Sequence, residues 1–212
     1  MRSLLSCLML AGVTAFAAAP AAAEETDAAP PTWVRQFITL DEEARIYSLD
    51  YFTPTQQDRD IRVESLDVAH AWRSVNGLEL QARLGLFHAD GSRQDVPLTG
   101  PPNSTLFGVS GGGVLRLYPV EFWWQYPRAH FFLQYAEQIL YTGRTEGSQF
   151  PAGGTGVNGF ARWGWGFSYD FTPGLSVEAL YLHGHVSNGS GVVPQNPMWN
   201  GHGAGVALRY RF

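Results

Sequence analysis

The stretch FARWGWGFSYDF, residues 160–171, decides the fold, because its residues alternate with a period of two. One set is apolar or aromatic: Ala161, Trp163, Trp165, Phe167, Tyr169 and Phe171. The other set is small or polar: Arg162, Gly164, Gly166, Ser168 and Asp170. Successive side chains of a β-strand point to opposite faces, so the stretch predicts a strand with one apolar and one polar face.

The same alternation recurs along the chain, for example in LELQARLGLF (78–87) and GAGVALRYRF (203–212). It predicts eight strands, at about 44–52, 61–73, 78–88, 106–118, 129–141, 160–171, 175–187 and 203–212. Short connectors such as 172–174 alternate with long ones such as 142–159. Eight such strands form a closed barrel of the smallest common size, whose interior is filled by side chains.

The period alone does not say which face meets water, since a soluble sandwich or a lipocalin would bury the apolar face. The composition favours a membrane, because aromatic residues make up 14% of the chain and charged residues only 16%. Residues 1–23 have the charged start, apolar run and small-residue end of a secretory signal peptide. The final ALRYRF resembles the last strand of bacterial outer-membrane proteins.

These features predict an all-β protein, an eight-stranded antiparallel transmembrane β-barrel that follows a cleaved signal peptide. The expected divisions are the signal peptide at 1–23, an N-terminal arm at 24–43 and the barrel at 44–212, in a bacterial outer membrane. The only cysteine, Cys7, lies within the signal peptide, so the mature chain has no disulfide. A net charge of −5 without a basic cluster argues against a nucleic-acid partner.

A chemical motif ends the seventh predicted strand, in LYLHGHVSNGSG (180–191). His183, His185 and Ser187 share the face of Tyr181, which on this reading is the lipid side of the wall near the headgroups. A His two residues from a Ser lies about 6–7 Å away along a strand, so the two can act as general base and nucleophile. His-x-Ser alone is ordinarily a solvated strand edge. A metal site with His202 is the other alternative, although no carboxylate or thiol accompanies it.

Several motifs in order resemble the PagL family of lipid A deacylases. They are the Gly-rich GGGVLRLYPV (111–120), the loop GTGVNGF (154–160), HVSN (185–188) at a strand end, QNPMWN (195–200) and the aromatic final strand. The resemblance covers residues 105–212 well and the first half of the chain loosely. It implies an outer-membrane barrel that hydrolyses an ester-linked 3-hydroxyacyl chain of lipid A, with no cofactor or metal, and lipopolysaccharide as its partner.

The resemblance also assigns roles to single residues. Ser187 corresponds to the family's nucleophile and His185 to its base, while the oxyanion and substrate-binding positions correspond to Asn188, Gly189 and Asn196. The family's orienting Glu is missing, because residues 191–203 contain no carboxylate. Asn200 is the nearest polar substitute and is the third predicted catalytic residue. Glu178 is a poor substitute, since its parity points it into the barrel.

Two hypotheses follow from the sequence. In the first, Ser187 and His185 form an active lipid A esterase. In the second, the barrel is catalytically silent and serves envelope structure or surface interaction. His183 is an alternative to His185 as the base. Which acyl chain is cut, and whether the barrels form a homodimer, stay open at this stage.

Overall fold

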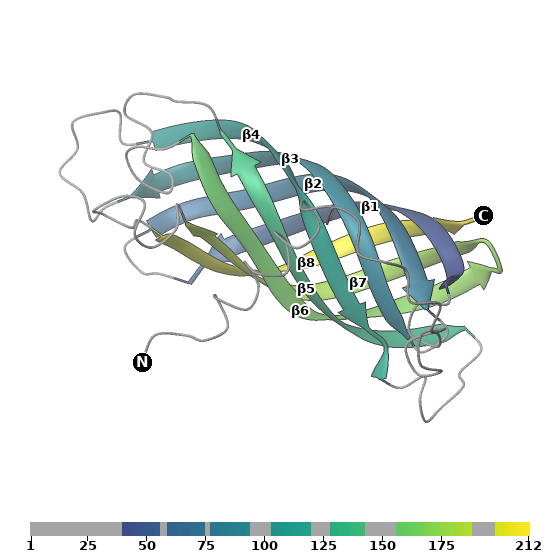
Figure 1. Cartoon of the computed structure of the whole chain (residues 1–212). Helices are drawn as coiled ribbons and strands as arrows, with labels where there is room; N and C mark the ends of the chain where they lie inside the picture. The colour runs from purple at the N-terminus through teal and green to yellow at the C-terminus, as the bar shows by residue number, and fades with distance from the viewer. Residues whose placement is uncertain are drawn as a thin grey trace, which may run out of the picture. The chain divides into compact units, whose positions relative to one another are not determined.

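The computed structural model describes residues 40–55, 59–74, 77–93, 103–119, 128–142, 156–187 and 198–212. They form a closed barrel of eight strands (Figure 1). The strands are β1 Leu40–Pro54, β2 Arg59–Ser74, β3 Leu78–Arg93, β4 Asn103–Leu117, β5 Ala129–Tyr141, β6 Val157–Thr172, β7 Leu175–Ser187 and β8 Met198–Arg211. The predicted eight-stranded antiparallel barrel is therefore confirmed.

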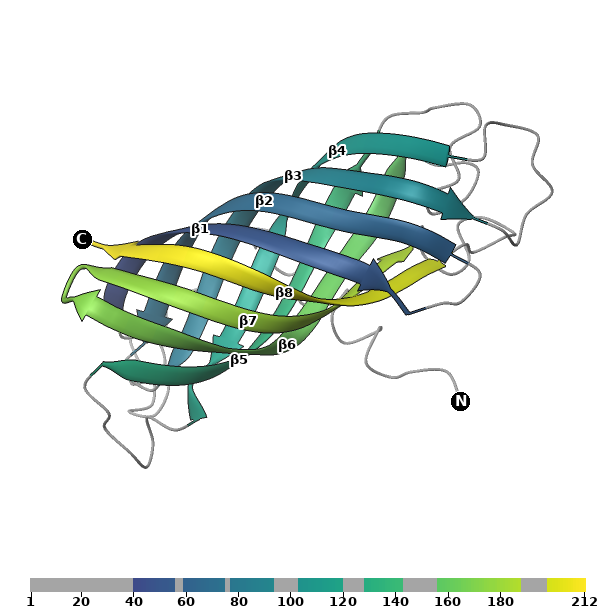
Figure 2. The same ribbon diagram turned by 180° about the vertical axis from the view of Figure 1, so that it is seen from behind.

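Each strand pairs antiparallel with the next along the chain, and β1 pairs with β8 to close the barrel. The closing ladder runs from Ala44 opposite Arg211 to Pro54 opposite Gly201, and Figure 2 shows β1 and β8 side by side. We call the end of the barrel with Ser74, the Pro173–Gly174 turn and Phe212 the turn end. The end with Pro54, Ser187 and Met198 is called the far end. Closure gives each of the eight strands two hydrogen-bonded neighbours, as a membrane-spanning sheet requires.

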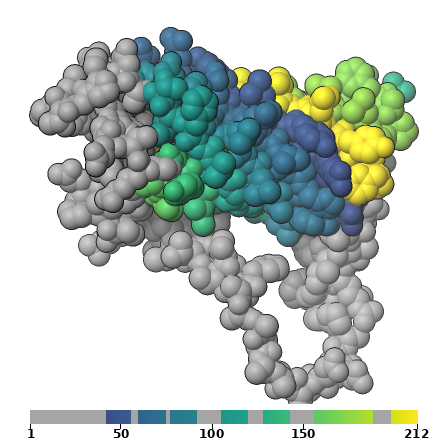
Figure 3. All heavy atoms as spheres, turned by 90° about the horizontal axis from the view of Figure 1, so that it is seen from above, coloured from purple at the N-terminus to yellow at the C-terminus, as the bar shows by residue number. Residues whose placement is uncertain are grey.

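The outer wall of the barrel is apolar. The large hydrophobic side chains predicted to share one face all point outward, and many are about half exposed or more, such as Leu84 at 66% and Phe107 at 71%. Figure 3 shows side chains of β1 (purple) between those of β2 (blue) and β8 (yellow) on this wall. Such a surface is stable in lipid rather than in water, so the faces have the arrangement of a transmembrane barrel.

Within the described residues, no helix has the length and apolar character needed to cross a bilayer.

Several strands differ at their ends from the prediction; β3, for example, ends at Arg93 rather than at residue 88. β1 begins at Leu40 rather than at residue 44, and β8 begins at Met198 rather than at residue 203. In the early part of β8 the outward residues include the polar Asn200 and His202, and the inward residues include Gly201 and Gly203. The apolar-outward pattern used to find strands is therefore missing there, although the backbone pairing with β7 continues.

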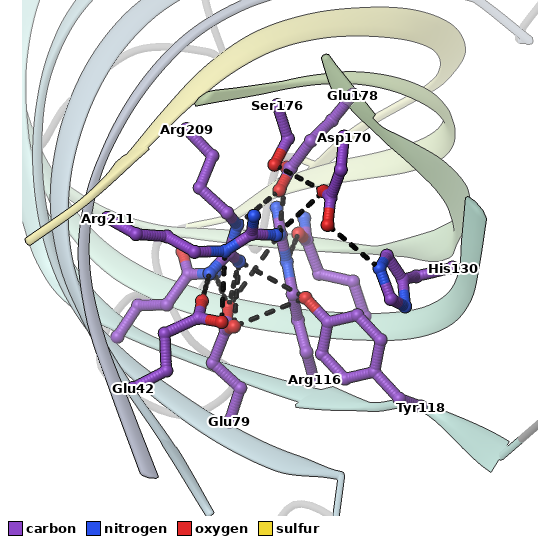
Figure 4. A network of polar contacts seen from close by, with 12 residues as sticks. Glu42, Glu79, Arg116, Tyr118, His130, Asp170, Ser176, Glu178, Arg209 and Arg211 are labelled. Atoms are coloured by element: carbon purple, nitrogen blue, oxygen red, sulfur yellow. Dashed lines mark hydrogen bonds and ion pairs between the residues drawn. The ribbon is translucent and has the colours of Figure 1, made fainter. Parts of the chain in front are cut away.

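The turn end of the lumen holds a network of buried charges (Figure 4). The Arg209 guanidinium donates to Glu79 at 2.7 Å and to Glu178 at 2.8 Å. Arg116 donates to the second Glu178 oxygen, also at 2.8 Å. Nearer the rim, Arg211 pairs with Asp170 at 2.8 Å. Arg209 and Arg211 therefore point into the lumen and meet carboxylates there.

A second charge cluster lies midway along the lumen, around Arg162. Its Nη1 donates to Asp50 and Asp67, both at 2.7 Å, and to Ser65 at 2.8 Å. Its Nη2 donates to Gln138. All of these side chains are buried, so each charge depends on its partners for the stabilisation that water would otherwise provide.

Aromatic side chains fill the lumen beyond Arg162, toward the far end. Phe160 packs edge-to-face against Phe52 and Phe87, with ring centroids 6.0 and 5.4 Å apart, and Phe52 packs likewise against Trp199 at 6.3 Å. The Trp199 indole N–H donates to the Ile61 carbonyl at 3.0 Å. All four rings are almost fully buried. Side chains therefore fill the lumen at the level of these rings, as expected for eight strands.

Candidate active site on the outer wall

The predicted catalytic residues of β7 lie on the outside of the barrel. His183, His185 and Ser187 point outward and are partly exposed, while Leu182, Gly184 and Val186 between them point into the lumen. All three outward residues lie in the last part of β7, at the far end of the barrel. The imidazoles and the hydroxyl therefore share one face of the wall, as the period of two predicted.

His185 is held by a hydrogen bond to Asn200. The two residues are direct cross-strand partners of β7 and β8, and His185 Nδ1 lies 2.7 Å from Asn200 Oδ1. A carbonyl oxygen only accepts, so the contact assigns the ring proton to Nδ1. The lone pair of Nε2 is then available to accept a proton. This is the tautomer that a general base needs.

The backbone of Asn200 is fixed by the end of β1. The Thr55 N–H donates to the Asn200 carbonyl at 3.0 Å, and the Thr55 hydroxyl donates to the same oxygen at 3.2 Å. Two residues further along β8, the Thr53 hydroxyl donates to the His202 carbonyl at 3.3 Å. Barrel closure thus positions the residue that orients His185.

His183 has different surroundings from His185. Its ring stacks on Trp163 of β6, with centroids 5.7 Å apart and planes 15° apart. Tyr181 meets the same ring edge-on at 5.3 Å. These aromatic contacts account for His183 as a packing residue, and they favour His185 as the base of the pair.

The alternative of a metal site has limited support. His183 and His202 are direct cross-strand partners, so two imidazoles do lie close together on the wall. Across the part of the chain that the structure describes, however, no three His, Cys, Asp or Glu side chains are grouped so as to hold a metal ion.

Two carboxylates bear on the question of the missing acid. Glu178 points into the lumen, as its parity predicted, and its charge is balanced there by Arg116 and Arg209. Glu137 of β5 points outward instead, and it lies in the same cross-strand row as His185, with Ala161 between them. Two strand spacings separate Glu137 from His185, about 10 Å between the backbones.

The Glu137 carboxylate also lies near the neighbouring cross-strand row, which contains Gly159 and Ser187. The Tyr135 hydroxyl donates to its Oε2 at 2.6 Å. Its Oε1 would lie 3.5 Å from a Cβ added at Gly159, which is the cross-strand partner of Ser187. An acid from a neighbouring strand was an open alternative at the level of the sequence, but no motif pointed to Glu137, which lies far from HVSN along the chain. The outward parity of Glu137 on β5 is the one signal that could have pointed to it.

Asn188, Gly189 and Asn196, the predicted oxyanion and substrate-binding residues, lie outside the described residues.

No family model matches the chain, and no curated protein matches it. Among solved structures, Neisserial surface protein A matches over 81% of this chain and 97% of its own, with a TM-score of 0.50 and 12% identity. The chain has the fold of a small outer-membrane barrel. This fold supports the predicted location in a bacterial outer membrane.

Two other solved structures are similar at lower scores. The Yersinia pestis outer membrane protein Ail matches with a TM-score of 0.38 and 15% identity, over 81% of this chain and all (100%) of its own. The outer membrane protein AlkL matches with a TM-score of 0.41 and 12% identity, over 92% of this chain and 95% of its own.

Proposed function

We propose that this barrel is an outer-membrane lipid A deacylase that hydrolyses an ester-linked 3-hydroxyacyl chain. The observation that carries the proposal is the hydrogen bond between His185 Nδ1 and Asn200 Oδ1, two residues from Ser187 on the same outward face. The bond orients an imidazole beside a hydroxyl on the surface of the wall. The order of the sequence motifs, which resembles that of the PagL family, supports the same assignment.

In the proposed mechanism a side-chain rotation brings the Ser187 hydroxyl to His185 Nε2. The Ser187 oxygen attacks the ester carbonyl carbon while Nε2 takes its proton. The tetrahedral intermediate collapses, and the imidazolium returns the proton to the leaving sugar oxygen. Water then hydrolyses the acyl-enzyme with the same base, which releases the 3-hydroxy fatty acid and restores Ser187.

Asn200 is a positioning residue in this scheme. Its amide holds the productive ring tautomer, but it carries no charge to stabilise the imidazolium that forms during the reaction. We therefore expect a slower enzyme than one with a carboxylate at this place. Glu137 is the nearest outward carboxylate that the row offers, and it would act on the developing positive charge through space.

The surroundings of the site suit a lipid substrate. Filling of the lumen by Phe52, Phe160 and Trp199 directs a substrate to the outer wall. Trp165 and Tyr181 lie next to His183 on the side of the turn end. Their ring centroids are 5.8 Å apart on the outer wall, in the manner of an interfacial aromatic belt. Short turns of outer-membrane barrels face the periplasm, so the far end and the row at its edge would face the outer leaflet, which holds lipopolysaccharide.

Mass spectrometry of lipid A tests the proposal. Cells that express the parent chain are compared with cells that express Ser187→Ala or His185→Ala. We expect lipid A to lose one hydroxyacyl mass only with the parent, because each variant removes a group that takes part in bond breaking. Ser190→Ala is the matched hydroxyl control and should leave the product unchanged.

The experiment also distinguishes a second candidate function. The neutral Asn200 in place of an acid is the observation that favours a catalytically silent barrel with a structural or surface role. Unchanged lipid A in all strains, with each protein extracted from the outer membrane in its folded form, would overturn the first function and favour the second.

A further inference from the structure

A groove runs across the outer wall of β1–β4, away from the His185 row. It has a volume of about 520 Å³. Its lining residues are Arg45, Val68, Ala69, His70, Ala82, Arg83, Leu84, Gly111 and Gly112. The side chains of Arg45, Val68, His70, Ala82 and Leu84 are those that point to the outside of the barrel. The groove is therefore a hollow in a wall that otherwise carries bulky, lipid-facing side chains.

The floor of the groove is made by small residues. Ala82 of β3 lies in one cross-strand row between His70 of β2 and Gly113 of β4, so this row has little side-chain bulk beyond the imidazole. The neighbouring row is taller, because Val68 and Leu84 are cross-strand partners and both are well exposed. A floor of small residues beside aliphatic side chains has the shape and polarity to hold an acyl chain.

One end of the groove carries charges of both signs. Arg45 is exposed, and its guanidinium lies over the Phe212 ring, 5.8 Å from the centroid, at the turn end. Glu43, two residues earlier on the same face of β1, is also exposed and pairs with His70 at 3.5 Å. The His70 ring in turn packs on Trp72 and Phe212, with centroids 4.5 and 5.9 Å away. A cation and an anion thus lie side by side on a base of aromatic rings.

We propose that this groove binds one zwitterionic phospholipid of the phosphatidylethanolamine type, from the leaflet at the turn end. The lipid phosphate lies on Arg45, its ammonium on Glu43, and one acyl chain along Ala82, Val68 and Leu84. An anionic lipid such as phosphatidylglycerol offers only the phosphate, so Glu43 would repel its net charge. The pair of opposite charges therefore selects the zwitterion.

Native mass spectrometry of the full barrel tests this binding. The protein is released from nanodiscs that contain equal amounts of phosphatidylethanolamine and phosphatidylglycerol. The parent should retain one phosphatidylethanolamine. Arg45→Gln, which removes the phosphate contact, should lower this retention about tenfold, the effect of losing one charge-assisted contact. Ala82→Phe, which fills the floor of the groove, should also lower it, because the acyl chain then has no space there.

Two control variants separate binding from folding. Ala179→Phe places the same ring outward on β7, and Arg62→Gln removes an exposed cation of β2, both away from the groove. Both should retain the lipid as the parent does, and all variants should show the heat-modifiable gel migration of a folded barrel. Equal retention by the parent and Ala82→Phe would overturn the proposal.

The Glu43→Gln variant tests the headgroup assignment. It should lose the preference for phosphatidylethanolamine and retain phosphatidylglycerol equally well, because the repelling carboxylate is gone. An unchanged preference in this variant would show that Glu43 does not bind the lipid ammonium, and would overturn the zwitterion assignment.

Discussion

At the scale of single residues, the amide of Asn200 determines what His185 can do. The hydrogen bond fixes the ring tautomer, yet the amide leaves the imidazolium without a counter-charge. A sequence pattern could name Asn200 as the nearest polar substitute for an acid. It could not provide the contact, because the contact depends on the cross-strand register of β7 and β8.

Asn200→Asp supplies the missing charge at the same position. The carboxylate would accept the same Nδ1 hydrogen and stabilise the imidazolium, so we expect the rate of lipid A deacylation to rise by about tenfold or more. The rate is measured on the purified barrel in mixed micelles with lipid A. Asn200→Leu should lower the rate below that of the parent. A rate for Asn200→Asp at or below the parent value would argue against the positioning role.

At the scale of elements, the ends of two strands, β5 and β7, were predicted best. β5 and β7 begin and end where the alternation predicted, at 129–141 and 175–187. The start of β8 was missed because Asn200 and His202 interrupt the apolar face while Gly201 and Gly203 remove the contrast with the lumen side. That interruption is also what makes this part of the wall a candidate site.

Gly205 shows how β8 accommodates a buried charge of β1. Gly205 and Asp50 are direct cross-strand partners, and a Cβ on Gly205 would collide with the Asp50 carboxylate in the lumen. Gly205→Val should therefore lower the free energy of unfolding by about 1–3 kcal/mol through overpacking. Urea titration of the barrel in lipid vesicles measures it.

Ala204→Val is the matched control for this prediction. Residue 204 points outward on the same strand, so an added side chain there meets lipid instead of Asp50. We expect its stability to differ little from that of the parent. A similar loss in both variants would place the cause in the strand itself and not in the lumen.

At the scale of the whole molecule, stability depends on ionic clusters that join distant parts of the chain. Parity predicted that Glu178 faces the lumen, but not that it meets Arg209 there. Arg162 of β6 binds Asp50 of β1 and Asp67 of β2, contacts that follow from barrel closure and strand stagger. Neither barrel closure nor strand stagger can be predicted from the alternation of a single strand.

Arg162→Met should destabilise the barrel strongly. Among the described residues, the cation that Asp50 and Asp67 would keep is Arg83, whose Nη1 lies 3.9 Å from each, so the free energy of unfolding should fall by about 3–5 kcal/mol. The double variant that adds Asp50→Asn should recover much of this loss, because Arg83 and Asp67 then remain as one buried cation and one buried anion 3.9 Å apart. Equal stability of the single and double variants would contradict this account.

The contact between Thr55 and Asn200 has a consequence for the timing of biogenesis. It joins the first strand to the last over 145 residues of sequence. Non-local pairings of this kind form late in folding, since the intervening chain must be ordered first. If Asn200 reaches its final position only when the barrel closes, the proposed esterase acquires its working geometry in the last step of insertion. A nascent chain in transit would then leave the lipids that it passes intact.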